Sequence, residues 1–208
     1  MTDPAAGPPA ESSGNYRKHT SANPLQRWLI DRFHREVLGA VLASGASSAL
    51  EVGCGEGFVL RYLRDRVGYI QLEGVDLDPA AVAVARRLVP GLPVQVGDVY
   101  HLPYRDGAFD LVLCLEVLEH LEDPRAALGE IRRVTRRLAL LSVPHEPWFR
   151  LANLLRGKNL RAWGDDPEHR QHWGRAGFAD LTAEAFTPRR LSTSFPWLIA
   201  LVERPTGG

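Results

Sequence analysis

The stretch Glu51–Gly57, which reads Glu-Val-Gly-Cys-Gly-Glu-Gly, constrains the fold more than any other part of this chain. The apolar run over 49–52 predicts a short buried strand before it, and the sequence over 58–63 predicts a helix after it. A strand, a glycine turn and a helix in this order form the nucleoside- or phosphate-binding corner of an α/β sheet. A dinucleotide-binding fingerprint does not fit, because Phe58 occupies the position of its third glycine.

Strand and helix patterns alternate along most of the chain. Further strands are expected at 71–75, 94–97, 110–114 and 138–143, and further helices at 24–43, 79–88, 124–137 and 176–186. Two β-rich segments, 190–195 and 197–202, predict an antiparallel hairpin at the sheet edge. The fold class is therefore α/β, with a seven-stranded, mostly parallel sheet and helices on both of its faces.

Two segments, 1–15 and 144–175, fall outside this alternating pattern of strands and helices. Residues 1–15 are rich in Pro, Ala, Gly and Ser and predict a disordered tail before a single domain over 16–208. Residues 144–175 form a long connection rich in Trp, His and Arg, with a helix expected at 147–156. A connection of this length between core elements predicts a lid or a binding loop.

Composition limits the cellular setting and the partners. The chain has 208 residues, with 25 basic and 25 acidic side chains, so its overall charge favours neither nucleic acid nor an anionic membrane. Two cysteines, Cys54 and Cys114, are too few for a disulfide scaffold or a zinc site. No apolar run reaches the ~20 residues of a membrane-spanning helix, and the N-terminus lacks the apolar core of a signal peptide. We expect a cytoplasmic protein with no metal.

Acidic residues follow two of the predicted strands. In an open α/β sheet, ligands bind beyond the carboxyl ends of the strands. Asp76 ends the second strand about twenty residues after the glycines, where a carboxylate can reach ribose hydroxyls. Asp98 follows the third strand and can accept from an exocyclic amine, while the Val99 amide can donate to a ring nitrogen. The alternatives are that Asp76 is a solvated acid at a helix entry and that Asp98 is a turn residue.

Together these features resemble the class I methyltransferases that use S-adenosylmethionine (SAM), over residues 49–143. The sequence Glu51–Gly57 resembles their motif I, and Val117–Pro124, Val-Leu-Glu-His-Leu-Glu-Asp-Pro, is similar to the small-molecule branch that includes quinone-type enzymes. The resemblance implies a Rossmann-like class I methyltransferase fold. It also implies SAM as cofactor and S-adenosylhomocysteine (SAH) as product.

The resemblance also implies roles for individual residues. Glu51 would organise the methionine amino group through the loop, and Leu77 would contact adenine. Tyr16 would fold over the cofactor from the N-terminal side. The cofactor-binding candidates are Tyr16, Glu51, Gly53, Cys54, Gly55, Asp76, Leu77, Asp98, Val99 and Leu115.

Histidines and tryptophans are the candidates for the acceptor side of the site. Histidine suits a general base because its pKa lies near neutral pH, and the candidates are His120, His169 and His172, with His145 as a weaker fourth. A capping or packing role remains open for His120, and a structural role for His169 and His172. Substrate-contact candidates are Trp148, Trp163 and Trp173, with Arg150, Arg156, Lys158 and Arg161 available to attract an anionic group. Anchoring of the lid is the alternative for the tryptophans, and exposure to solvent for the basic residues.

The function we expect is methyl transfer from SAM to an O, N, S or C nucleophile of a small molecule. Two alternatives remain open: an enzyme acting on RNA or protein, and a SAM-binding regulator without catalysis. The alternative of an RNA- or protein-modifying enzyme lacks support. Methyltransferases that act on amino groups of nucleic acid or protein glutamine carry an Asn-Pro-Pro-Tyr type of loop, whereas here the strand over 110–114 leads into Leu-Glu-Val. The expected partner is a small-molecule substrate, with no nucleic acid and no membrane, and the expected state is a monomer or homodimer.

Overall fold

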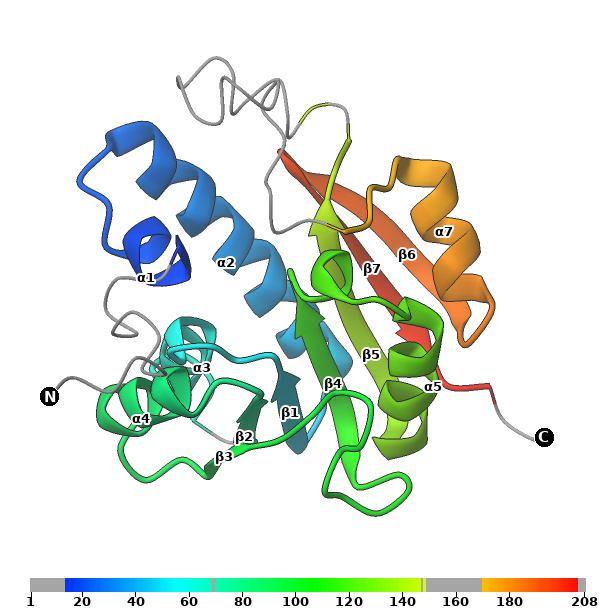
Figure 1. The fold of residues 1–208 in the computed structure, drawn as a ribbon, viewed down its shortest axis with the longest axis horizontal. Helices are drawn as coiled ribbons and strands as arrows, with labels where there is room; N and C mark the ends of the chain where they lie inside the picture. Colours follow the sequence, from blue (N-terminus) through cyan, green and yellow to red (C-terminus); the bar gives the residue numbers. More distant parts are fainter. Residues whose placement is uncertain (1–13, 69, 147, 149–169, 206–208) are drawn as a thin grey trace, which may run out of the picture.

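The computed structural model of the chain describes residues 14–68, 70–146, 148 and 170–205. Seven strands form one sheet in the order β3-β2-β1-β4-β5-β7-β6 (Figure 1). The strands are β1 (Ser48–Val52), β2 (Gln71–Asp76), β3 (Val94–Val96), β4 (Phe109–Leu115), β5 (Thr135–Pro144), β6 (Thr187–Ser194) and β7 (Trp197–Glu203). The first five pair in parallel, and β7 pairs antiparallel with both β5 and β6. The predicted fold class is confirmed.

Helices cover both faces of this sheet. They are α1 (Gly14–His19), α2 (Pro24–Ser44), α3 (Phe58–Arg64), α4 (Pro79–Leu88), α5 (Pro124–Val134) and α7 (Arg175–Ala183), with a short 3-10 turn, η2, at Leu118–His120. Apolar side chains of α2, α3 and α4 pack in one core on one face, and those of α5 and α7 pack in a second core on the other. Neighbouring strand residues alternate between the cores, as Ala49 and Leu50 do, because side chains point to opposite faces in turn.

Three helices begin with the same device. Asn23, Asp78 and Asp123 precede a proline, and each side-chain oxygen accepts a hydrogen bond from a backbone N–H of the first turn. Proline fits there because its missing N–H would have had no partner within the helix. These starts are where the sequence placed them.

The end of α5 and the start of β5 differ from the sequence expectation. The helix was expected to continue to Arg137 but ends at Val134, and the strand begins at Thr135. Thr135 is fully buried with an extended backbone and pairs with Phe109. A buried β-branched residue packs well in a sheet, and this outweighs the helical pattern of the arginines that follow. The helix α7 also ends earlier than expected, at Ala183 rather than at Phe186, and β6 begins at Thr187, which pairs with Glu203.

The chain segments outside the sheet are described in part. The expected tail over 1–13, and the expected helix over 147–156 apart from residue 148, lie outside the described residues. Gly14 and Asn15, which the sequence assigned to the tail, belong to α1. Residues 170–174 are not helical.

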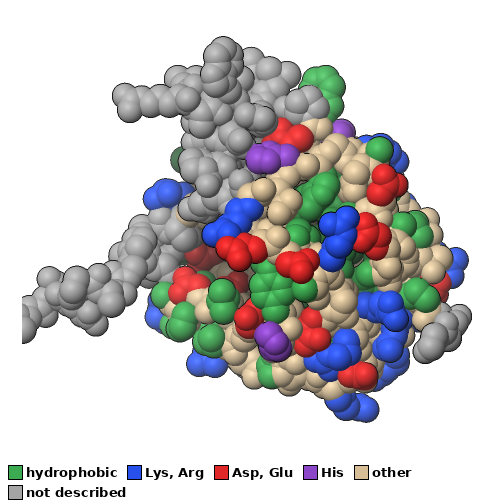
Figure 2. Space-filling view, turned by 45° about the vertical axis from the view of Figure 1, so that its right-hand side comes forward, with side chains coloured by type: hydrophobic (Ala, Val, Ile, Leu, Met, Phe, Trp, Pro, Cys, Tyr) green, Lys and Arg blue, Asp and Glu red, His purple; other side chains and the backbone are tan. Residues whose placement is uncertain are grey.

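Two surface features bear on possible partners. Within the described residues, no helix combines the length and the apolar character needed to cross a bilayer. On the face shown in Figure 2, basic and acidic side chains are interspersed and do not separate by sign.

Candidate functional site

The carboxyl ends of β1 and β4 border a pocket. The pocket lies where the strand order reverses, since β1 connects outward to β2 on one side and pairs with β4 on the other. Its lining residues come from α1, α2, the glycine turn, α3 and the end of β4. They are Asn15, Lys18, His19, Ile30, Phe33, Glu51, Gly53, Cys54, Phe58, Val59, Leu115 and Glu116.

The glycine turn takes a conformation that other residues rarely adopt. Gly53, Gly55 and Gly57 have φ angles of 71°, 52° and 80°. A Cβ atom at Gly53 would lie 2.3 Å from Cγ2 of Val117, and one at Gly55 would lie 2.9 Å from Nδ2 of Asn15. The turn is therefore a bare backbone surface at the edge of the pocket.

Asp76 joins this turn to the end of β2. Its Oδ2 accepts a hydrogen bond from the Gly55 N–H at 2.7 Å, and its Oδ1 accepts one from the Asp78 N–H at 2.9 Å. Burial raises the pKa of the Asp76 carboxyl, and these two backbone donors act in the opposite direction. The structure thus brings together the first two strand ends that the sequence singled out.

The third strand end lies beside the second. The Gly97 N–H donates to the Asp76 carbonyl oxygen at 2.9 Å, so Asp98 directly follows a backbone contact with β2. Oδ1 of Asp98 accepts from the Tyr100 N–H at 2.9 Å, and the carboxylate is half exposed. Leu77 is 69% exposed, an unusual position for a large apolar side chain next to a core strand. Val99, which follows Asp98 in the sequence, is partly buried and packs against the core that contains α5.

Glu51 is a buried acid at the end of β1. Its side chain is 3% exposed, and its Oε2 has no hydrogen-bond partner within the described part of the chain. Burial, reinforced by the charge of Asp76, raises the pKa of this carboxyl well above its usual value. A buried carboxyl with an open acceptor position can accept from a donor that enters the pocket.

The short helix α1 covers the open side of the pocket. Asn15 donates to Oε2 of Glu56, and the ring of Tyr16 lies 5.8 Å from that of Phe58. The His19 ring stacks between Phe58, at 4.5 Å, and His34, at 5.2 Å. The expected role of Tyr16 at the cofactor stays a prediction. The sequence offered no reason to choose His19 or His34, because histidines without a motif carry no positional signal.

Glu116 follows β4 directly and lines the pocket. Its Oε1 accepts a hydrogen bond from the Ser142 hydroxyl at 3.0 Å. Burial raises the pKa of the Glu116 carboxyl, and the nearby charge of Lys18 lowers it by a smaller amount. Nζ of Lys18 lies 5.0 Å above the ring of Trp197. Glu116 is not among the residues expected from the sequence, although its position just after a strand end is the same signal that identified Asp76.

The two cysteines are buried near this pocket. Cys54 lines it, and Cys114 pairs with Val52 of the neighbouring strand. Burial raises the pKa of both thiols, so both stay protonated and neither has the character of a nucleophile.

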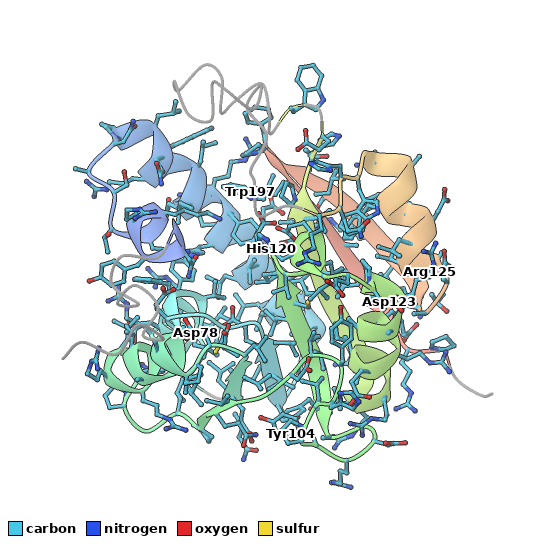
Figure 3. All side chains as sticks on the ribbon, in the orientation of Figure 1. Asp78, Tyr104, His120, Asp123, Arg125 and Trp197 are labelled. Carbon is cyan, nitrogen blue, oxygen red and sulfur yellow. The ribbon has the colours of Figure 1, made fainter. Side chains whose placement is uncertain are left out.

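The acceptor-side candidates are less closely gathered. His120 lies on η2 at the same end of the sheet as Trp197, whereas Tyr104 lies at the opposite end (Figure 3). His172 is exposed on an extended segment, and His145 pairs with Trp173 in an isolated bridge. Trp148 is 47% exposed. His169 and Trp163 lie outside the described residues, as do Arg150, Arg156, Lys158 and Arg161. Among described residues, no three His, Cys, Asp or Glu side chains are placed to hold a metal ion.

A parallel sheet with a glycine turn and acidic strand ends at its switch point defines a nucleoside-binding α/β protein. A family model described as a methyltransferase domain matches residues 50–143. Norajmaline N-methyltransferase of Rauvolfia serpentina is 38% identical over 91 residues, 41% of this chain and 31% of that protein. A phthiotriol/phenolphthiotriol dimycocerosates methyltransferase of Mycobacterium tuberculosis is 31% identical over 139 residues, 66% of this chain and 48% of that protein.

A solved structure shares the fold. Magnesium protoporphyrin IX methyltransferase of Synechocystis, with bound SAH, superposes with a TM-score of 0.69 at 19% identity, over 91% of this chain and 92% of that one. Residues 50–143 therefore match a methyltransferase domain, and structural neighbours with bound SAH indicate SAM as the cofactor. The present chain spans a quarter to a half of the length of its most similar curated relatives.

Proposed function

We propose that the protein transfers a methyl group from SAM to a small molecule. The observation that carries this proposal is the contact between Asp76 and the Gly55 amide, which joins an acidic strand end to the glycine turn. Relatives whose names specify small acceptors, such as norajmaline, support the choice of substrate class. The expected cytoplasmic location and monomeric or dimeric state stay predictions.

The residues of the pocket fit this cofactor. The bare backbone at Gly53 and Gly55 offers room for close approach, and the open acceptor position on Glu51 suits an ammonium group. Asp76 would hold ribose hydroxyls, because a carboxylate oxygen that already accepts one backbone N–H can accept a second donor. Leu77, Asp98 and Val99 would contact the adenine, and Cys54 and Leu115 would fill the space beside the methionine part.

The sulfonium of SAM supplies an activated methyl group. The chain's own residues then need to align the acceptor and to exclude water. The stacked rings of Phe58 and His19 cover one side of the pocket and serve the second purpose. A general base is needed only for an acceptor that does not readily lose its proton, and His120 and His172 remain the proposed candidates within the described residues.

Calorimetry with SAM and SAH tests the cofactor assignment. The wild-type protein should bind both, and Asp76→Ala should weaken binding by about 1–3 kcal/mol because it loses hydrogen bonds to a charged group. Asp180→Ala, on the exposed side of α7, is the matched control and should bind as the wild type does. No measurable binding by the wild type would contradict the proposal.

A turnover assay tests the substrate class. Methyl transfer from radiolabelled SAM should go to members of a small-molecule panel of phenols, amines and thiols, and not to unmodified RNA or to protein lysate. Transfer to RNA or protein alone would overturn the small-molecule proposal. Binding of SAM with no transfer to any of these acceptors would favour a regulatory role.

A further inference from the structure

The end of β4 carries a residue in an unfavourable backbone conformation. Glu116 has a φ of 59°, and no other residue except glycine has a positive φ among those described. Such a conformation is strained and persists only where the surroundings impose it, often at a ligand site. The strain turns the Glu116 side chain toward the pocket that it lines.

A buried serine holds Glu116 in place. Ser142 is fully buried within the apolar strand β5. Its hydroxyl donates to Oε1 of Glu116 at 3.0 Å, and the Glu116 N–H lies 3.2 Å from both the hydroxyl and the carbonyl oxygen of Ser142. One strand residue therefore fixes both the backbone and the carboxylate, which leaves Oε2 of Glu116 to face other groups.

Trp197 provides a donor beside this carboxylate. The indole ring is 3% exposed, at the start of β7, and it packs against Phe33 at 5.0 Å. Its Nε1–H is buried and faces the Glu116 carboxylate, whose pKa it lowers, but its geometry to this or any other described acceptor is not that of a formed hydrogen bond. A buried donor without a partner is unfavourable, so a ligand atom that accepts from it is bound more tightly.

We propose that Glu116 and Trp197 together bind a hydroxyl group of the methyl acceptor. A hydroxyl matches the pair because it donates its hydrogen to the Glu116 carboxylate and accepts from the Trp197 indole N–H. A protonated amine can only donate, and a carbon nucleophile does neither. Burial raises the pKa of the Glu116 carboxyl, and the charge of Lys18, which lies over the Trp197 ring, acts in the opposite direction and favours the charged, accepting form. This inference rests on the proposed function and narrows its substrate class to hydroxyl compounds.

The test compares the binding of phenol and of anisole, which lacks the O–H, to SAH-loaded protein by ligand-observed NMR. The wild type should bind phenol at least tenfold more tightly than anisole. Glu116→Ala and Trp197→Phe should each reduce this preference below threefold. The controls Glu122→Ala and Trp28→Phe change the same residue types at exposed positions and should keep the wild-type preference.

Calorimetry with SAH on the same variants separates the possible failures. Under the proposal, Glu116→Ala and Trp197→Phe bind SAH within threefold of the wild type. If Glu116→Ala lost as much affinity for SAH as for phenol, the carboxylate would be assigned to the cofactor. This result would overturn the inference but not the proposed function. A wild type without phenol preference, or a Glu116→Ala variant that keeps it, would also overturn it. A wild type that does not bind SAH would overturn the proposed function as well.

Discussion

At Gly53, backbone conformation and packing both exclude a side chain. Its φ of 71° is strained for any other residue, and Cγ2 of Val117 occupies the place of a Cβ. Exposed glycines inside helices have no such reason to be there. Gly39 in α2 and Gly129 in α5 would gain a Cβ without meeting any atom within 4 Å. The same substitution should therefore have opposite effects at the two kinds of position.

We expect Gly53→Ala to lower the free energy of unfolding by about 1–3 kcal/mol and to weaken SAH binding, because the backbone would be strained and Val117 would have to move. Gly39→Ala should raise stability by about 0.5–1 kcal/mol and leave SAH binding unchanged. Thermal unfolding and SAH calorimetry measure both. A Gly53→Ala protein as stable and as tight-binding as the wild type would show that the turn tolerates a side chain.

At the scale of elements, α1 is a six-residue helix whose side chains are at most partly buried, so it depends on a few contacts with other elements. Its His19 ring fits between Phe58 of α3 and His34 of α2. Burial, with the nearby charge of Lys18, lowers the pKa of His19 to about 2 and that of His34 to about 4. Both rings are therefore neutral while α1 is packed in place.

This packing should weaken in acid. A histidine released from the stack regains a pKa of about 6.5, so protonation favours the released state as the pH falls below 6.5. At pH 5.5 the cost is at most about 1.4 kcal/mol per histidine. SAH affinity should fall by up to about tenfold per histidine between pH 7.5 and pH 5.5. His19→Phe keeps the ring contacts and should show a smaller fall; an identical pH dependence in both proteins would rule out His19 as a cause.

The start of α5 offers a simpler test of an element. Asp123 accepts from the N–H groups of Arg125 and Ala126, at 3.1 and 3.0 Å. Asp123→Ala should cost about 1 kcal/mol, as the loss of a helix cap does. Arg132→Ala, an exposed change on the same helix, should cost less than half of that in the same urea titration. Equal effects of the two substitutions would mean that the cap contributes nothing.

At the scale of the whole molecule, the sequence predicted the sheet well because each strand is flanked by a turn or a capped helix start. Asn23, Asp78 and Asp123 marked three such starts. The end of α5 was not predictable, because the arginines after Thr135 suit a helix, and only burial against β4 makes them a strand.

The residues of the candidate site also differ in whether the sequence could predict them. The strand-end residues Asp76 and Asp98 could be found from spacing along the chain. Trp197 and the histidine stack could not, because their contacts form only when α1, α2 and β7 come together in space. Glu116 lies directly after a strand end, so the signal that identified Asp76 could have found it as well.

A crystal structure of the protein with SAH tests the central claim most directly. The account predicts ribose hydroxyls on Asp76, adenine beside Leu77 and Asp98, and the sulfur facing the side of the pocket that holds Glu116. SAH bound elsewhere, or bound here with Asp76 turned away from the ribose, would contradict it.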